Sequence, residues 1–249
     1  TGTVKIEFDQ NQQPIYEIVR PVAYDFMQPT NELMDFMRSC AALCFGTLTQ
    51  RNLESRQTIQ AMLDACEQNG GAIRLFDINL RKDCYSDETI VGSLKRADVL
   101  KLNEDEAHSV ASILAIDSPD PVEIAKRLFT QFPIQHCLVT LGERGALCIS
   151  REGETIYEPG YEVTLVDPCG SGDAFSAGFI LPFLRKRSLQ ECCRLGNVLG
   201  AIVATQRGAT VAISPEQALQ FYHNAPRRIC DPRFGCYAIQ LEGKEPWTI

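Results

Sequence analysis

Two glycines flank a serine and are followed at once by an aspartate in the segment VDPCGSGDAF, residues 166–175. The small and apolar residues that come next predict a helix that begins just after Gly170. The first amides of such a helix lack intrahelical partners, and the helix dipole places about half a positive charge there. Because Gly170 and Gly172 have no side chain, an anion such as a phosphate can approach these amides closely.

Asp173 belongs to the first turn of this predicted helix and projects into the same space. A carboxylate beside an anion site can accept the proton of a hydroxyl group that attacks a phosphoryl group. An aspartate in a first turn is also favourable by ~0.3–1 kcal/mol without any catalytic role. The sequence contains neither a GxxxxGK[ST] nor a GxGxxG motif, so neither of these common phosphate loops competes with this turn.

Two further segments place polar residues or glycines directly after predicted strands. In KLNEDEA, Asn103 and Glu106 have the spacing of a capping box, in which each side chain binds the other residue's amide. Ligands bind at the carboxyl ends of parallel strands, so Glu106 can also hold Mg²⁺ or its waters. The segment TLGERGA, residues 140–146, is either a plain tight turn between two strands or a turn that lies against a nucleotide.

The rest of the chain supplies the elements that must position these residues. From Ala41 onward, short apolar runs alternate with longer helical patterns, which is typical of a parallel sheet covered by helices. The expected strands are 41–46, 72–78, 98–102 and 136–141, with 147–150 and 155–166 on an antiparallel side. The expected helices are 55–69, 86–96, 103–114, 121–132, 171–186 and 189–206, followed by a short one that opens at Ser214.

Three regions are expected along the chain. Residues 1–30 predict a small β-hairpin lid, because TVKIEFD and PIYEIVR are separated by QNQQ. Residues 31–226 predict the α/β core. Residues 227–249 show no clear period and are expected to form an irregular tail.

Composition narrows the function classes. The formal net charge of −8 argues against a nucleic-acid-binding surface, and no apolar run approaches the ~20 residues of a membrane helix. The eleven cysteines are odd in number and lack CxxC pairs with zinc spacing, which favours reduced thiols and a cytoplasmic protein. The adjacent pair Cys192 and Cys193 falls in a predicted helix, where packing is the expected role.

VDPCGSGDAF, KLNEDEA and VTLGERGA, in this order and at these spacings, resemble the PfkB or ribokinase-like family of carbohydrate kinases from Gly2 to about Ile213. TGTVKIEFD, FGTLTQR and FDINLR look most like their counterparts in bacterial fructokinases. The resemblance implies a Rossmann-like, mostly parallel sheet flanked by helices, with a small β lid. It also implies ATP-dependent phosphorylation of a sugar hydroxymethyl group with Mg²⁺, and a homodimer formed through the lid strands.

The resemblance also implies roles for single residues. Asp173 looks like the general base, and the amides of Gly170, Ser171 and Gly172 resemble the family's anion hole. The other implied sites are Asn103 and Glu106 for Mg²⁺ and phosphate, Thr140, Gly142 and Gly145 for the nucleotide, Asn197 near the adenine, Arg81 near the transferring phosphate, and Asp167 for a monovalent cation such as K⁺.

The sequence also departs from the family pattern. The usual DTxGAGD is DPCGSGD here, so Pro168 replaces a threonine and Ser171 replaces an alanine. The serine keeps the backbone amide, whereas the proline removes a hydroxyl and a donor. The family's opening segment, with most of its sugar contacts, has no counterpart before Thr1. We therefore expect either a piece of a longer kinase or a shortened protein with exposed edge strands.

These observations predict an ATP-dependent kinase of a monosaccharide, with fructose as the leading acceptor. Ribose, 2-keto-3-deoxygluconate or a nucleoside are the alternatives within the same chemistry. A non-catalytic nucleotide-binding relative is the alternative from another class, and the missing opening segment favours it. In each case the expected partners are small molecules rather than nucleic acid or membrane.

Overall fold

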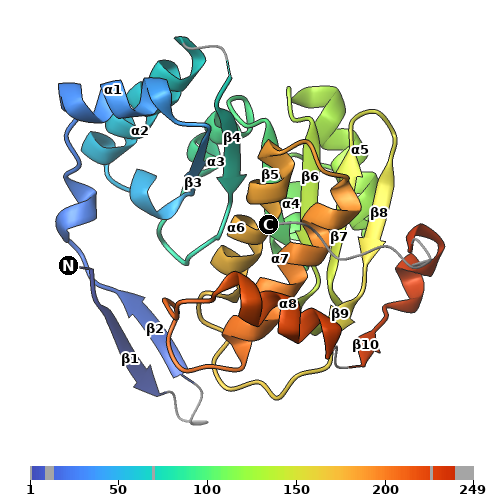
Figure 1. Ribbon diagram of the computed structural model, residues 1–249. Helices are drawn as coiled ribbons and strands as arrows, with labels where there is room; N and C mark the ends of the chain where they lie inside the picture. The colour runs from blue at the N-terminus through green and yellow to red at the C-terminus, as the bar shows by residue number, and fades with distance from the viewer. Residues whose placement is uncertain (1, 9–13, 69–70, 225–226, 239–249) are drawn as a thin grey trace.

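The centre of the protein is a six-stranded sheet in the order β3-β4-β5-β6-β7-β8 (Figure 1). The computed structural model describes residues 2–8, 14–68, 71–224 and 227–238. Neighbouring strands from β3 to β6 run parallel, whereas β7 and β8 are antiparallel to their neighbours. The predicted α/β sheet with an antiparallel side is therefore confirmed. The strands are β3 (Ala42–Phe45), β4 (Ile73–Asp77), β5 (Val99–Asn103), β6 (His136–Thr140), β7 (Ala146–Ser150) and β8 (Thr155–Glu158).

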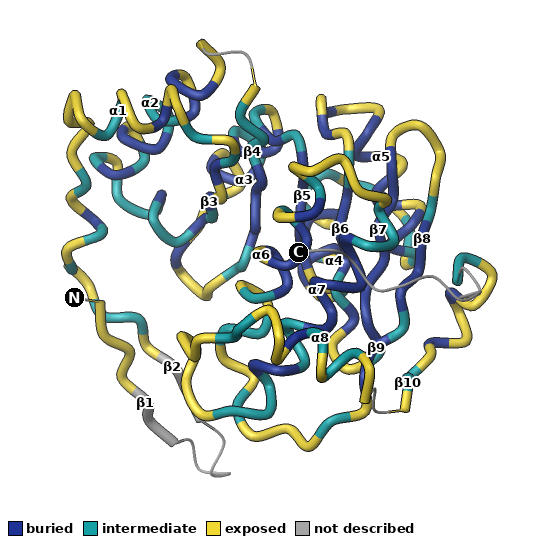
Figure 2. Tube along the Cα trace, viewed as in Figure 1, coloured by how far each residue is buried: buried dark blue, intermediate teal, exposed yellow. Residues whose placement is uncertain are grey.

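Helices cover both faces of this sheet. The larger buried cluster joins one face to the first five helices, and a second cluster joins the other face to α6 and α7. Helix α8 packs against α7 through a third cluster. Figure 2 shows the central strands buried between these layers. The helices are α1 (Asn31–Ser39), α2 (Leu53–Gln68), α3 (Asp87–Leu94), α4 (Glu104–Ile113), α5 (Pro121–Gln131), α6 (Ser171–Leu184), α7 (Leu189–Ala204) and α8 (Pro215–His223).

The predicted hairpin forms a separate two-stranded sheet. Strand β1 (Val4–Phe8) pairs antiparallel with β2 (Pro14–Ile18), and Figure 1 shows the pair projecting from the body. The predicted QNQQ turn lies outside the described residues. The chain after the hairpin is fixed to the core by Arg51, which donates to the Val19 carbonyl and forms an almost fully buried ion pair with Asp25 at 2.7 Å.

Three local predictions are corrected. Residues 31–39, for which no element was predicted, form α1, capped by the Thr30 side chain. The predicted strand 155–166 ends early, because only β8 and β9 (Gly160–Tyr161) are strands. Residues 227–238 are ordered into β10 (Arg228–Ile229) and the 3₁₀ helix η4 (Pro232–Tyr237) rather than an irregular tail. Residues 239–249 lie outside the described part of the chain.

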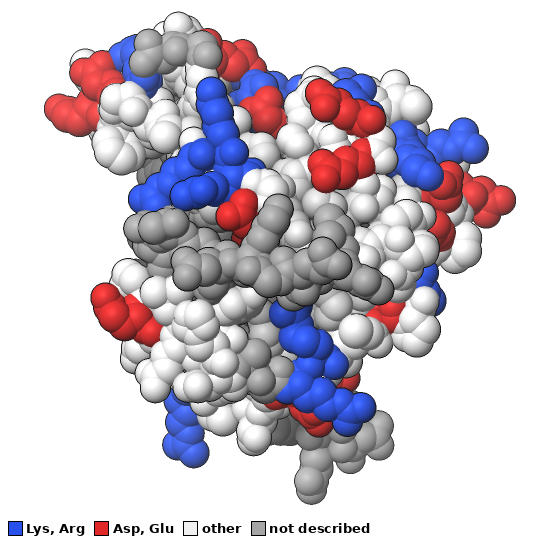
Figure 3. Space-filling model, turned by 45° about the vertical axis from the view of Figure 1, so that its right-hand side comes forward, with Lys and Arg blue, Asp and Glu red and all other residues white. Residues whose placement is uncertain are grey.

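The surface and the cysteines agree with the composition. On the face in Figure 3, Lys and Arg side chains form small groups beside Asp and Glu, with uncharged surface between them. All eleven cysteines are free thiols, and Cys192 and Cys193 are buried in α7 as expected. In the described ranges, every helix is too short or too polar to cross a lipid bilayer.

Candidate active site

The start of helix α6 is an open helix end. Gly170 precedes it with φ of +84°, and a Cβ at this residue would lie 2.7 Å from the carbonyl oxygen of Ala209, so only glycine fits. No side chain caps this helix, in contrast to α1, α3, α4, α5, α7 and α8. The Ser171 amide donates to the carbonyl of Pro168 at 3.2 Å. The amides of Gly172 and Asp173 bind no described residue and are open to an anion.

The Asp173 carboxylate stands beside these amides. It is exposed, and within the described residues it has no hydrogen-bond partner and no ion-pair partner. A first-turn aspartate that neither caps a helix nor pairs with a cation is available to an incoming group. The structure therefore places a carboxylate that can accept a proton next to two backbone amides that can donate hydrogen bonds to an anion.

A buried ion pair lies against the first turn of α6. Lys101 Nζ lies 2.9 and 2.8 Å from the two carboxylate oxygens of Asp77, and each side chain is 8% exposed. The Ser176 hydroxyl of α6 donates to Asp77 at 3.0 Å. A Cβ on Gly172 would lie 3.2 Å from Lys101 Nζ, so the ammonium group packs directly against the helix start. This pair was not predicted from the sequence. The signal that could have indicated it is one acidic residue in β4 and one basic residue in β5, two strands that are otherwise mostly apolar.

A cavity of about 460 Å³ opens beside α6 and α7. It brings together seven of the residues predicted for the site, from the ends of two strands, the turn between β6 and β7, and two helices. Three of them are glycines, at which a ligand can approach the backbone closely. The Ser171 hydroxyl is buried and has no hydrogen-bond partner within the described part of the chain. The predicted residues in the lining are Asn103, Thr140, Gly142, Gly145, Ser171, Gly172 and Asn197.

Two turns meet at one wall of this cavity. A Cβ on Gly145 would lie 2.1 Å from the Glu158 carbonyl oxygen, and a Cβ on Gly160 would lie 1.8 Å from the Glu143 carbonyl oxygen. The turn between β6 and β7 therefore touches the turn between β8 and β9 backbone to backbone. The Asn197 side chain supports the second turn, donating to the carbonyls of Glu158 at 2.8 Å and Pro159 at 3.2 Å. Gly160 was not predicted as a site residue.

The predicted capping box at the start of α4 is present. Asn103 Oδ1 accepts from the Glu106 amide at 2.8 Å, and Glu106 Oε2 accepts from the Asn103 amide at 2.8 Å. The other Glu106 oxygen accepts from the amide of Leu80 at 2.9 Å. Glu106 is buried and joins the loop after β4 to the end of β5. It does not line the cavity, although Asn103 does.

Two other predicted residues lie outside the cavity lining. Arg81 is exposed, and its guanidinium donates to the Leu80 carbonyl at 3.2 Å. Asp167 is partly exposed and accepts from the amides of Cys169 at 2.9 Å and Gly208 at 3.1 Å. These two backbone hydrogen bonds hold the pKa of Asp167 below its usual value. Asp167 thus fixes the loop that leads into α6.

A family model described as "pfkB family carbohydrate kinase" matches residues 1–217. The chain belongs to this family. The fructokinase of Klebsiella pneumoniae is 29% identical over 232 residues, which cover 88% of this chain and 73% of that enzyme. The predicted resemblance is therefore confirmed, and so is the membership of an enzyme family of carbohydrate kinases.

Solved structures support the ribokinase-like fold. The aminoimidazole riboside kinase from Salmonella enterica, complexed with aminoimidazole riboside and an ATP analog, is 25% identical with a TM-score of 0.63. That match covers 73% of this chain and 62% of that kinase. A double mutant of the fructokinase from Vibrio cholerae, in a form with fructose, ADP and potassium ion bound, is 24% identical with a TM-score of 0.68. Here 84% of this chain and 69% of that enzyme are covered.

Gly160→Ala is expected to open the wall of the cavity of this PfkB chain. The added methyl group would overlap the Glu143 carbonyl, and overpacking of this kind costs about 1–3 kcal/mol. We expect weaker nucleotide binding together with a lower melting temperature. Gly92→Ala is the matched control, because nothing lies within 4 Å of a Cβ at that helical position. Nucleotide affinity in Gly160→Ala equal to that of the control would contradict the binding of a nucleotide at this wall.

Proposed function

We propose that this chain is an ATP-dependent sugar kinase that phosphorylates the hydroxymethyl group of a monosaccharide, with fructose as the leading acceptor. One observation carries the proposal: the exposed carboxylate of Asp173, which has no partner among the described residues, adjoins the open amides of Gly172 and Asp173 itself. A cavity with several glycines in its wall begins at this helix start and is large enough for a nucleotide. The family and its fructokinase members support the same activity.

The residues at the start of α6 would act together in phosphoryl transfer. Asp173 takes the proton of the sugar hydroxyl while the hydroxyl oxygen forms a bond to the γ-phosphorus of ATP. At the same time, the bond from that phosphorus to the β,γ-bridging oxygen breaks, and ADP leaves. The amides of Gly172 and Asp173 donate to the phosphoryl oxygens, on which negative charge is distributed. In this proposal Gly170 gives the turn its shape, and Arg81 adds positive charge near the transferring group.

The cavity residues suit a nucleotide. Ser171 lines the cavity and carries a buried hydroxyl that binds no described residue, and Gly142 and Gly145 allow close approach to the backbone. Thr140 and Asn197 complete this wall. We assign the nucleotide to this side and the sugar to the side of Asp173 and Arg81, which do not line the cavity.

Glu106 and Asn103 would hold Mg²⁺ through water. Each Glu106 oxygen accepts one amide and keeps a second lone pair. Within the described residues, no group of three or more His, Cys, Asp or Glu side chains is placed to hold a metal alone. This suits an ion that is bound mainly by phosphates and water, and which, when bound, neutralises phosphate charge. A monovalent cation such as K⁺ at Asp167 and a homodimer through the β1–β2 hairpin remain predictions.

A panel of acceptors tests the proposal. Fructose, ribose, 2-keto-3-deoxygluconate and a nucleoside would each be incubated with Mg²⁺ and ATP, and ADP release measured. We expect the highest kcat/KM with fructose. The Salmonella kinase, complexed with aminoimidazole riboside, makes a nucleoside the second candidate. ATP binding without turnover of any acceptor would instead favour the non-catalytic alternative.

A further inference from the structure

Residues 227–238 form an ordered segment that follows the family match, which ends at residue 217. We call these residues the C-terminal clasp. Its strand β10 pairs antiparallel with β9, and its helix η4 packs beside β8. The clasp therefore contacts the strands that carry one wall of the proposed nucleotide cavity.

Arg228 makes the first attachment. Its guanidinium lies 4.0 Å from the ring centroid of Tyr161 and donates to the Tyr161 hydroxyl at 2.9 Å. It also forms an ion pair with Glu158 at 2.6 Å, where the carboxylate is 2% exposed. Tyr161 lines the cavity, and Glu158 belongs to the turn that contacts Gly145. Arg228 thus holds the outer side of this wall.

Four charged side chains make the second attachment. Arg144 pairs with Glu104 at 2.7 Å and with Asp231 at 2.5 Å, and Arg233 pairs with each of the same two carboxylates at 2.7 Å. We call Glu104, Arg144, Asp231 and Arg233 the charged square. Hydrogen bonds from Arg233 and Arg144 lower the pKa values of Asp231 and Glu104, so both acids are ionised at neutral pH. The square joins the clasp to the ends of β5 and β6.

A buried tyrosine makes the third attachment. The Tyr157 hydroxyl donates to the Arg144 carbonyl at 2.6 Å and accepts from the Asp231 amide at 2.6 Å. Tyr157 is fully buried, and the Phe234 ring lies 5.9 Å from its ring. The backbone of the turn 142–145 is therefore bonded through one side chain to the backbone of the clasp.

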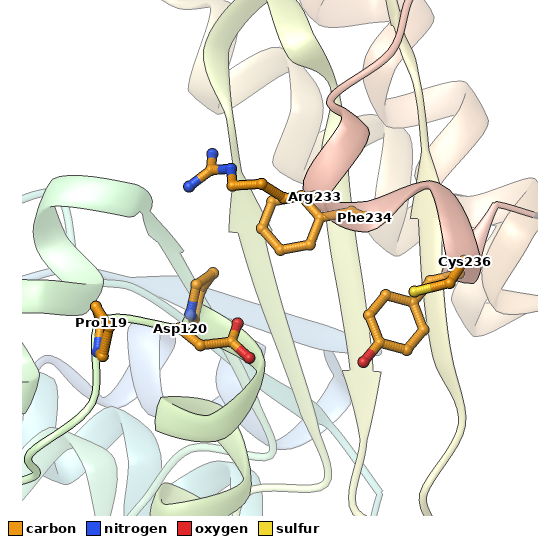
Figure 4. A pocket seen from close by; sticks show the side chains of 7 residues that line it. Pro119, Asp120, Arg233, Phe234 and Cys236 are labelled. Carbon is orange, nitrogen blue, oxygen red and sulfur yellow. The ribbon is translucent and has the colours of Figure 1, made fainter.

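The side of helix η4 that faces α5 is not closely packed. A hollow of about 470 Å³ separates it from the start of α5 (Figure 4). Pro119 and Asp120 lie on one side of this hollow, and Arg233, Phe234 and Cys236 lie on the other. Because α5 does not pack closely here, the position of η4 depends on Phe234, Tyr157 and the charged square.

We propose that the clasp positions the turn 142–145 for the nucleotide, and that Asp231 and Arg233 are its positioning residues. The inference rests on the proposed function, because it takes the cavity to bind ATP. Arg144 does not line the cavity and forms its ion pairs with the square, whereas its neighbours Gly142, Glu143 and Gly145 do line the cavity. Loss of an ion pair in the charged square should weaken nucleotide binding at the turn 142–145 and leave sugar binding beside Asp173 and Arg81 unchanged.

Two substitutions of opposite charge test this inference. Asp231→Asn removes a negative charge near a polyanion site, and Arg233→Met removes a positive one. If positioning governs the site, both variants bind ATP and ADP roughly tenfold more weakly, a change that corresponds to about 1.4 kcal/mol. We expect kcat within about twofold of the parent and an unchanged KM for the sugar. Nucleotide Kd is measured by calorimetry at a temperature at which all variants are folded.

The controls make the same charge changes elsewhere. Asp64→Asn and Arg96→Met alter an ion pair of 2.8 Å whose members do not line the cavity. Opposite shifts in the two test variants would show a charge effect alone and overturn the inference, as would test variants that bind like the controls. If the parent binds no nucleotide, the proposed function fails and the inference fails with it. A parent that binds, with unaffected variants, overturns only the inference.

Discussion

Replacing Asp173 with asparagine is expected to lower kcat for sugar phosphorylation by roughly 10²–10⁴-fold, the usual contribution of a general base. Asparagine keeps the size of the side chain and the open amides of the first turn, but it cannot accept the proton of the hydroxyl. Nucleotide affinity should stay at the parental value, because Asp173 does not line the cavity. Steady-state kinetics with saturating fructose and a separate binding measurement check both parts.

Asp105→Asn is the matched control for this substitution. Asp105 is an exposed aspartate in the first turn of α4, another helix that follows a strand of the sheet. The control therefore subtracts the loss of a favourable dipole interaction, ~0.3–1 kcal/mol, that any such change causes. Equal turnover in the two variants would remove Asp173 from the role of base.

The order of elements could be predicted because most of them carry a local signal. Apolar runs of strand length predicted β3 to β7, and the spacing of Asn103 and Glu106 predicted the cap of α4. Helix α1 carried the same kind of signal, since Thr30 caps it and Glu32 lies in its first turn. The predicted strand 155–166 failed because β9 leaves the main sheet and pairs with β10, a partner about seventy residues away. A local pattern holds no information about that distant partner.

The site was predictable where backbone conformation decides the residue. Glycines with a positive φ, such as Gly142, Gly145 and Gly170, stand out in a sequence because a turn needs them. The pair of Asp77 and Lys101 depends instead on register, which places these two residues directly opposite each other on β4 and β5. The clasp could not be found by periodicity, since single side chains such as Arg228 and Asp231 hold it. The amide of Ser171 likewise looked open in sequence but is bonded to Pro168.

Lys101→Met is expected to lower the free energy of unfolding by about 3–5 kcal/mol. The substitution leaves the Asp77 carboxylate, 8% exposed, with only the hydroxyl of Ser176 as a described side-chain partner. An unpaired buried charge costs far more than a lost surface pair. For a domain of this size the melting temperature should fall by roughly 10 °C. Denaturant titration of the variant measures the change directly.

Two comparisons separate this explanation from a general loss of packing. Lys126→Met removes a lysine whose ion pair with Glu123 is about half exposed, so it should cost less than about 1 kcal/mol. The double variant Asp77→Leu/Lys101→Met should recover much of the stability lost by Lys101→Met, because replacing both members of a buried pair with apolar groups is often neutral. It should not recover turnover if the ammonium group also supports the first turn of α6, against which Gly172 and Lys101 pack. Single and double variants of equal stability would show that burial of the Asp77 charge is not what the lysine compensates.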